Sequence, residues 1–427
     1  MNKHLLRNAS CVIAALAMSI SMGACGTQQS SNNSSGTGPI KIWLSNNEQE
    51  VSWGKEMVKA WNEQHPDQKI TAQEIPASSS SEEAITAAIT AGTAPCLVYN
   101  ISAAAVPGWV RQGGLVDLTQ FEGAAQYITD RSGNGVSIYQ TDGKYYQMPW
   151  KSNPVMVMYN KDIFTKAGID ADNPGITTFD GFLDAARKIV SSGAAQTAIW
   201  PSPTNEFYQP WFDFYPTYLA ETDGTPLTEN GKATFNDEAG KKVAEFWKTI
   251  YDEKLASQEK STDDAMSTGK TAMQMAGPWA IASYKDSVNV GVAPVPTSDS
   301  KSDPYTYADA KNVSMFATCQ YQQTAWEFLK FTTSEDADGK LLEATGQMPL
   351  RKNLADTYAD YFQKNPAYEI FAKQAEHTSD VPSLTNSTEV WQEFRKDYSS
   401  AVIFGKSSVD EFLSTAAVNV DKLLKQS

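Results

Sequence analysis

Residues 40–75 read IKIWLSNNEQEVSWGKEMVKAWNEQHPDQKITAQEI, and this stretch sets the fold class of the chain. It begins with an apolar run over residues 40–44, which is typical of a buried strand. Polar residues that can cap a helix follow at 45–47, and apolar residues then recur at helical spacing until Pro66 ends the helix. A second strand is predicted over residues 69–75. This strand–helix–strand order indicates a parallel sheet with helices on both faces.

The same alternation continues along the chain. A Ser-x-x-Glu capping box at residues 80–83 opens a helix that ends at Gly92, and a buried strand is predicted over residues 97–99. The tail from residue 353 onward is predicted to be wholly helical. The chain is therefore predicted to be an α/β protein. Its further predicted elements are strands at 154–159 and 288–293 and helices at 178–192, 236–251, 323–332 and 335–345.

Length and charge narrow the function classes. The chain has 427 residues, so about 150 residues per domain predicts two or three domains or two lobes. It carries 35 Lys plus Arg against 50 Asp plus Glu, for a net charge of −15. Such a balance argues against a nucleic-acid partner and against a polybasic membrane patch. It fits a protein that binds a neutral or weakly polar ligand.

The first residues predict a secretory signal rather than part of the fold. Residues 1–24 combine Lys3 and Arg7 with a short apolar run and small residues before Cys25. The apolar run is shorter than the roughly 20 residues of a membrane span. The exit at residues 21–25 resembles the bacterial lipobox, which implies that Cys25 is lipidated. An ordinary signal peptide with a chance cysteine is the alternative.

Residues 25–38 are predicted to form a flexible tether, because they are rich in Ser, Asn, Gly and Gln and have no apolar residue after Cys25. A signal, an anchor and a tether together place the mature protein on the extracytoplasmic face of the cell membrane. Cys96 and Cys319 are then in a compartment that permits a disulfide. Because both lie in apolar runs, two buried thiols are favoured over a bridge.

Catalytic and metal-binding patterns are absent from the sequence. His65 and His377 are the only histidines after the signal, and no His-Glu-x-x-His or Gly-x-Ser-x-Gly motif is present. Residues 267–271 end like a phosphate-binding loop, but Asp264 stands where the first glycine belongs. Paired acids such as Asp263 and Asp264 are expected by chance among 50. We therefore expect no enzymatic activity, no cofactor and no metal.

Several motifs in order resemble a known family. Gly92–Pro95 is similar to its "aGtaPDv" motif, with Cys96 in place of the usual aspartate, and the most specific match is the Gly-Lys-Thr-Ala-Met run at 269–273 that leads into Gly-Pro-Trp-Ala at 277–280. On these matches, spread over residues 40–405, the chain resembles the bacterial extracellular solute-binding proteins of the sugar-binding, maltose-binding-protein-like type. The other matching segments are 115–118, 143–149, 159–164, 292–296 and 345–351.

The resemblance implies a periplasmic-binding-protein fold, in which two hinge-linked α/β lobes close on a ligand. The chain would cross between the lobes near 148–153, 290–295 and 347–351. The N-terminal lobe would comprise residues 39–149 plus 293–347. The C-terminal lobe would comprise residues 150–292 plus 348–427. The ligand is expected at the carboxyl ends of the strands.

The resemblance also implies which residues hold a sugar. The apolar C–H face of a sugar ring suits flat aromatic side chains, and the hydroxyl groups around the ring suit amides, carboxylates, Arg and Lys. Trp279 in the Gly-Pro-Trp turn is the leading stacking candidate, and Trp391 with Arg395, one helical turn later, matches a second position. The further candidates are Ser45, Asn46, Asn100, Ser102, Trp150, Lys151, Asn153, Phe207, Trp211, Asp309, Lys311 and Asn312.

Each candidate also has a purely structural interpretation. The aromatics could pack in the core, Ser45 and Asn46 could only cap a helix, and residues 150–153 could form a plain hinge. Asp309 and Lys311 occupy a loop where relatives have two glycines, so they depart from the family pattern.

The favoured hypothesis is a monomeric, lipid-anchored capture protein. It would bind an oligosaccharide and deliver it to two membrane permease subunits driven by cytoplasmic ATPases. The alternatives are a binding protein for another polar solute such as a polyamine, which would need several carboxylates beside the aromatics, and an extracellular carbohydrate-active hydrolase.

Overall fold

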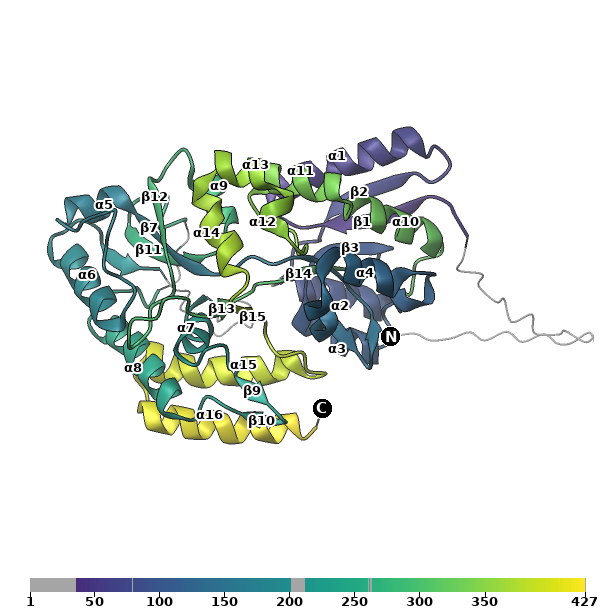
Figure 1. Cartoon of the computed structure of the whole chain (residues 1–427). Coiled ribbons are helices and arrows are strands. Elements are labelled where there is room, and N and C mark those ends of the chain that lie inside the picture. Colours follow the sequence, from purple (N-terminus) through teal and green to yellow (C-terminus); the bar gives the residue numbers. More distant parts are fainter. Residues whose placement is uncertain (1–35, 79, 201–211, 260, 262, 427) are drawn as a thin grey trace, which may run out of the picture. The chain divides into compact units, whose positions relative to one another are not determined.

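A computed structural model describes residues 36–78, 80–200, 212–259, 261 and 263–426 (Figure 1). The predicted signal, Cys25 and the candidates Phe207 and Trp211 lie outside the described residues. Gly38, at the end of the predicted tether, is buried, and its N–H donates a hydrogen bond of 3.0 Å to Thr324 Oγ1. Among the described helices, none has the length and apolar character needed to cross a membrane.

A five-stranded sheet, in the order β2-β1-β3-β14-β6, forms the first lobe (Figure 1). β1 runs parallel to β2 and β3, as the opening strand–helix–strand pattern predicts. β14 runs antiparallel to both β3 and β6, because the chain enters it on its return from the second lobe. The strands are β1 (Ile40–Leu44), β2 (Ile70–Glu74), β3 (Leu97–Ser102), β6 (Met148–Lys151) and β14 (Lys311–Met315).

The helices of the first lobe cover both faces of this sheet. Asn47 caps α1 by accepting the Glu50 N–H, as the sequence predicts, and Trp53 and Trp61 are buried beneath that helix. The lobe also carries α1 (Glu48–Gln64), α2 (Ser81–Ala91), η1 (Ala103–Ala105), α3 (Val106–Arg111), η2 (Leu118–Gln120), α4 (Ala124–Ser132), η3 (Asn134–Tyr139), β4 (Gln140–Thr141), β5 (Lys144–Tyr145), α10 (Gln322–Thr332) and α11 (Glu335–Thr345).

A four-stranded sheet, in the order β12-β7-β11-β8, forms the second lobe. β7 lies antiparallel to β11 and β12, and β11 lies parallel to β8. The strands are β7 (Met156–Asn160), β8 (Thr197–Ile199), β11 (Thr271–Ala276) and β12 (Val290–Ala293).

Helices and short strands complete the second lobe. α15 and α16, yellow in Figure 1, run side by side and pack together. These elements are α5 (Lys161–Lys166), α6 (Phe179–Ser191), α7 (Phe214–Glu221), β9 (Thr228–Glu229), β10 (Lys232–Ala233), α8 (Glu238–Asp252), α9 (Trp279–Tyr284), β13 (Thr306–Tyr307), α12 (Leu354–Thr357), α13 (Ala359–Lys364), α14 (Pro366–Gln374), β15 (Thr378–Ser379), α15 (Ser387–Tyr398), η5 (Ser399–Ile403) and α16 (Val409–Leu424).

The prediction of a wholly helical tail is wrong at one place. Thr378 and Ser379 form β15, which pairs in parallel with β13 at Thr306 and Tyr307. β13 belongs to the segment that returns from β12 toward the first lobe. The strand therefore forms because two segments distant in sequence meet, which local periodicity does not report.

Cys96 and Cys319 form a disulfide, so the expectation of two free thiols is wrong. Cys96 precedes β3 and Cys319 follows β14, and the pairing of Leu97 with Met315 brings these strand ends together. The Cα atoms lie 4.4 Å apart although 223 residues separate them along the chain. The bond therefore depends on the register of β14 against β3, which is a tertiary feature.

Arg131, at the end of α4, holds two of the segments that pass between the lobes. Its guanidinium donates to the carbonyls of Pro149, Trp150 and Leu350 at 2.7–3.0 Å. It also forms an ion pair of 2.8 Å with Asp338, whose side chain is 0% exposed. The strand β6 and the chain after α11 are thereby fixed to the same side chain.

We expect the Cys96→Ser/Cys319→Ser double variant to lower the free energy of unfolding by about 2–5 kcal/mol, because the disulfide closes a long loop in the unfolded chain. Urea unfolding with and without dithiothreitol measures this effect. Reduced wild type should match the variant, and the variant should not respond to the reductant. Equal stability of the variant and the oxidised wild type would contradict the prediction.

Candidate functional site

The register of β14 brings several predicted residues to one edge of the first sheet. Lys311 pairs with Ser102 of β3 on one side and with Lys151 of β6 on the other. Ser102 and Lys151 are the last residues of their strands, at the carboxyl edge where ligands of open α/β sheets bind. Ser45 lies at the same edge, directly after β1, and is buried. Asn46 beside it is exposed.

Lys151 and Asn153 belong to a buried polar network. Lys151 Nζ lies 2.5 Å from Glu50 Oε1 and 2.5 Å from Gln347 Oε1, and Asn153 donates to the same Gln347 oxygen at 3.1 Å. Burial would raise the pKa of Glu50, but the charge and hydrogen bond of Lys151 outweigh it and lower that pKa. The network therefore joins the first turn of α1 to two of the crossing segments.

Trp150 and Asn312 have structural partners. Trp150 packs against Trp53 at 5.5 Å and Tyr99 at 5.3 Å between ring centroids. Its backbone N–H donates to Asn312 Oδ1, and Asn312 is fully buried. These two side chains hold β6 against β14 from within the core. Asn100, the fourth residue of β3, adopts a left-handed conformation with φ 65°.

Aromatic rings form a wall that begins at Trp279. The indole lies over Gly277, where a Cβ would meet the ring at 1.9 Å, so only glycine fits there. Phe212 makes edge contacts with Trp279 and with Tyr307, each at 6.1 Å. Tyr307 contacts Tyr215 at 5.6 Å. Trp279 keeps part of its surface exposed, as stacking on a ligand requires.

Charged and hydroxyl groups lie beside this wall. Lys311 forms an ion pair of 2.8 Å with Asp309, whose φ of 40° is unusual for a residue other than glycine. Asp380 accepts a hydrogen bond of 3.2 Å from the Tyr139 hydroxyl, and its backbone carbonyl accepts one of 2.6 Å from Tyr215. Burial raises the pKa of Asp380 to about 7, with Asp309 adding to the effect and Lys311 opposing it.

Two hollows lie next to single members of this charged region. Tyr139 and Asp380 line one of about 520 Å³, between the segment before β4 and helices α12 and α14. Glu82, whose carboxylate accepts the Ser102 N–H at 3.3 Å, lines another of about 650 Å³ between α2, α3 and residues 385–389. Asp380 and Glu82 therefore each face a hollow, and neither of these two hollows is lined by Asp309, Lys311 or Trp279.

Trp391 and Arg395 are placed inside the second lobe. Both are 0% exposed, and Arg395 pairs with Asp213 at 2.7 Å. Burial would lower the pKa of Arg395, but the charge of Asp213 keeps it raised. The three alanines of η1, in the first lobe, pack against α15. One face of α15 is therefore covered by the first lobe. The structure does not bring these two residues to the wall at Trp279.

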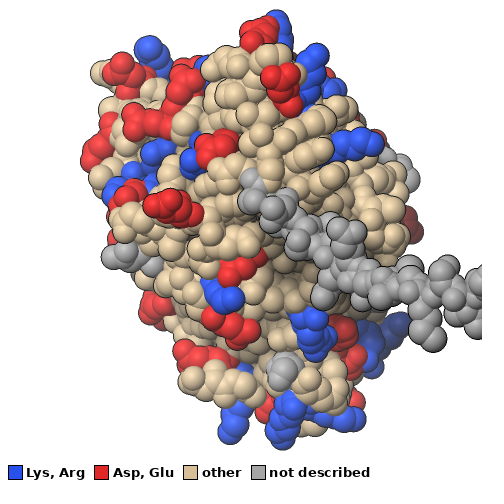
Figure 2. Space-filling model, turned by 90° about the vertical axis from the view of Figure 1, so that its right-hand side faces the viewer, with Lys and Arg blue, Asp and Glu red and all other residues tan. Residues whose placement is uncertain are grey.

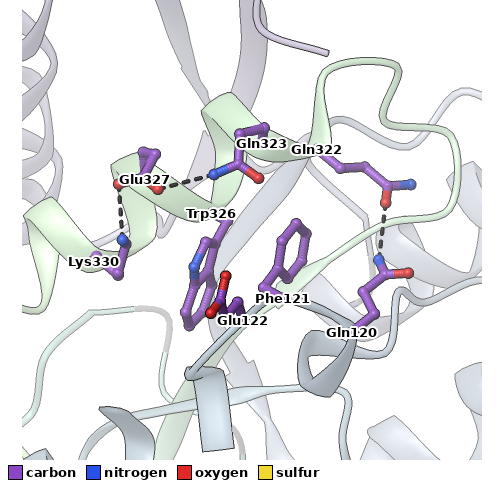
Figure 3. Close-up of a pocket in the computed structure, with 8 residues that line it drawn as sticks. All are labelled: Gln120, Phe121, Glu122, Gln322, Gln323, Trp326, Glu327 and Lys330. Carbon is purple, nitrogen blue, oxygen red and sulfur yellow. Dashed lines mark hydrogen bonds and ion pairs between the residues drawn. The ribbon is translucent and has the colours of Figure 1, made fainter. Parts of the chain in front are cut away.

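A separate hollow of about 480 Å³ lies between η2 and α10 (Figure 3). Phe121 stacks on Trp326 there with centroids 5.3 Å apart, and Trp326 is 2% exposed. The indole face is therefore already covered by protein. Gln120 is hydrogen-bonded to Gln322, and Gln323 to Glu327. Because the Trp326 indole is covered, this hollow lacks the partly exposed aromatic ring that Trp279 provides.

Sequence reasoning missed the residues that surround the predicted ones. Phe212, Tyr215, Tyr307, Tyr139 and Asp380 belong to no motif quoted for the family. Their only sequence signal is that 207–215 is rich in aromatics and that Asp380 interrupts a segment predicted as helical. Within the part of the chain that the structure describes, no group of three His, Cys, Asp or Glu side chains has metal-binding geometry.

Two α/β lobes linked by crossing segments, with aromatic and charged side chains from both at one place, define a two-lobed binding protein. The sequence matches the family described as bacterial extracellular solute-binding protein over residues 56–370. The chain belongs to this family.

On the face of the molecule in Figure 2, acidic and basic side chains are interspersed and no large patch of one sign is visible.

The chain is also similar to curated relatives and, in its fold, to solved structures. The chain is 25% identical to maltodextrin-binding protein MdxE of Bacillus subtilis over 99% of this chain and 98% of that protein. It is 27% identical to diacetylchitobiose binding protein DasA of Streptomyces coelicolor over 73% of each chain. Its fold superposes with TM-score 0.76 on the cyclic alpha-maltosyl-1,6-maltose binding protein from Arthrobacter globiformis, at 22% identity, over 92% of this chain and 100% of that one.

We expect Arg395→Met to lower the free energy of unfolding by about 3–5 kcal/mol, because it leaves the Asp213 carboxylate buried without its cation. The Asp213→Asn/Arg395→Met double variant should recover part of this loss. Urea unfolding of the three variants against wild type tests this. An Arg395→Met protein as stable as wild type would contradict a structural role.

We expect Asp380 to make the protein less stable as pH rises from about 4 to about 7. The folded state keeps a proton on Asp380 that the unfolded chain releases near pH 3.8, so the unfolded state binds fewer protons over this range. Asp380→Asn should flatten this dependence in urea unfolding at pH 5, 6, 7 and 8. Exposed Asp130, changed to asparagine, is the control, and an unchanged slope in Asp380→Asn would refute the prediction.

Proposed function

We propose that this chain is the substrate-binding component of an ABC importer and that it captures an oligosaccharide between its lobes. The observation that carries the proposal is the partly exposed Trp279, continued by Phe212 and Tyr307, beside charged groups from both lobes. Aromatic faces suit the C–H face of a sugar, and the Asp309, Lys311 and Asp380 side chains suit its hydroxyls. Curated relatives are named for maltodextrin, arabinooligosaccharide and galactooligosaccharide binding.

The proposal extends to how the protein works in the cell. Lipidation of Cys25 would hold it at the extracytoplasmic face of the membrane, with residues 25–38 as the tether up to the anchored Gly38. The lobes would divide at 39–149 plus 293–347 and 150–292 plus 348–427, except that β13 packs with the second lobe. The protein would act as a monomer, without cofactor or catalysis, and hand its ligand to two permease subunits with a cytoplasmic ATPase.

A cationic solute such as a polyamine is the second candidate. Asp309 and Asp380 lie near the ring of Tyr307, Asp380 also lies near that of Tyr215, and Glu82 lies near Lys311. Carboxylates beside aromatic faces are the chemistry that binds an ammonium chain. The same titration therefore includes spermidine.

Calorimetric titration of the domain starting at Gly36, which keeps the anchored Gly38, with oligosaccharides of several linkages tests the proposal, with chromatography of the sugar after each run. Saturable binding with intact sugar supports capture. Cleaved sugar would support the hydrolase instead, and a response to spermidine alone would keep the fold and replace the ligand class.

We expect Trp279→Ala to weaken binding of the best oligosaccharide by about tenfold or more, because a ring at the centre of a site carries much of the affinity. Phe404→Ala is the matched control, since that ring is 43% exposed on the second lobe, away from the Trp279 wall. Circular dichroism melting checks that both variants fold. Equal affinity in Trp279→Ala and wild type would remove Trp279 from the site.

A further inference from the structure

The charged side chains around Lys311 bear on which ligands could bind beside the Trp279 wall. Its ammonium lies 2.8 Å from Asp309, and burial is outweighed by the charges of Asp309, Glu82 and Asp380, which raise the pKa of Lys311. Lys151 is also near, but it is paired with Glu50 and adds no net charge. Among the described residues, Lys311 is thus the cation set against three acidic side chains, of which Asp380 ionises only near pH 7.

Without that ammonium the same surroundings would suit a cation. The carboxylates of Asp309 and Glu82, joined by Asp380 as it ionises near pH 7, would attract a protonated amine strongly in a partly dry site. With Lys311 in place, an incoming amine meets a like charge that is fixed between strands β3 and β6 by the register of β14. A like charge held close to a ligand's charge costs several-fold to many-fold in affinity.

Lys311 also gives a neutral polyol what it needs. Its side chain is 22% exposed, so it can reach a ligand while bonded to Asp309. An ammonium donates to a hydroxyl oxygen, and a carboxylate accepts from a hydroxyl hydrogen. Lys311 and Asp309 together therefore present one donor and one acceptor, which matches neighbouring hydroxyls of a sugar ring.

We propose that Lys311 is the specificity-determining residue that restricts this site to uncharged, hydroxyl-rich ligands and excludes cationic amines. The proposal rests on the proposed function, because it names the charge class of the ligand in that same site. Asp309 is its positioning partner. Its left-handed backbone at φ 40° turns the chain from β13 into β14, where Lys311 is the first residue.

Calorimetric titration of Lys311→Gln tests the proposal with three probes. These are the best neutral oligosaccharide, a glucosamine tetramer at a pH low enough to protonate its four amino groups, and spermidine. We expect Lys311→Gln to bind the neutral sugar at least tenfold more weakly than wild type and to bind a cationic probe at least tenfold more tightly. Lys311→Arg should keep the selectivity of wild type.

Lys330→Gln is the matched control, because it removes the same charge from α10, where Lys330 pairs with Glu327 at 2.8 Å (Figure 3). It should leave all three affinities unchanged. If Lys311→Gln does not fold, the Asp309→Asn/Lys311→Gln double variant leaves no carboxylate of that pair unpaired, and it should gain affinity for a cationic probe in the same way.

A folded Lys311 variant with the selectivity of wild type would overturn the proposal, and so would a wild type that binds the glucosamine tetramer as tightly as the neutral sugar. If wild type binds no neutral oligosaccharide, the proposed function fails by itself. The Lys311 proposal is then decided by spermidine, since it survives only if Lys311→Gln binds spermidine more tightly than wild type does.

Discussion

The Arg131 guanidinium is the interaction on which the arrangement of the two lobes depends. It is 4% exposed, pairs with the buried Asp338, and donates to backbone carbonyls of both Pro149 and Leu350. Arg351 adds a second ion pair of 2.9 Å to the same carboxylate. A buried charge that loses its partner is costly, so this group tolerates few arrangements. Two crossing segments are therefore held in one place on the first lobe.

The rest of the crossing region is also polar inside. Lys151, Glu50, Gln347 and Asn153 satisfy one another where β6 leaves the first sheet. Such networks fix geometry more than they add stability, because each member needs its partners at set distances. This network therefore holds the carboxyl edge of the first sheet in one geometry. The partly exposed Trp279 and Asp380 belong to the second lobe. A ligand that contacted residues of both lobes would affect the position of one lobe relative to the other.

Local sequence was a good guide to the elements and a weaker guide to the site. The caps at Asn47 and Asp237 and the spacing of apolar residues fixed where helices begin and which faces they bury. Motif position proposed Trp279 and the Asp309–Lys311 loop as ligand contacts. It also proposed Trp391 and Arg395, which share one helical face. Whether that face meets a ligand or the buried Asp213 depends on a segment 182 residues away.

The sequence by itself determined the α/β class, the ends of most helices and the family, because hydrophobic period, capping residues and short motifs are properties of neighbouring residues. Only the tertiary structure decided the Cys96–Cys319 bond, the enclosure of Lys151, and the meeting of Tyr139 with Asp380. Each of these joins residues roughly 100 or more positions apart. Strand register and the packing of one lobe on the other bring these residues together, and neither can be inferred from the residues next to each one in the sequence.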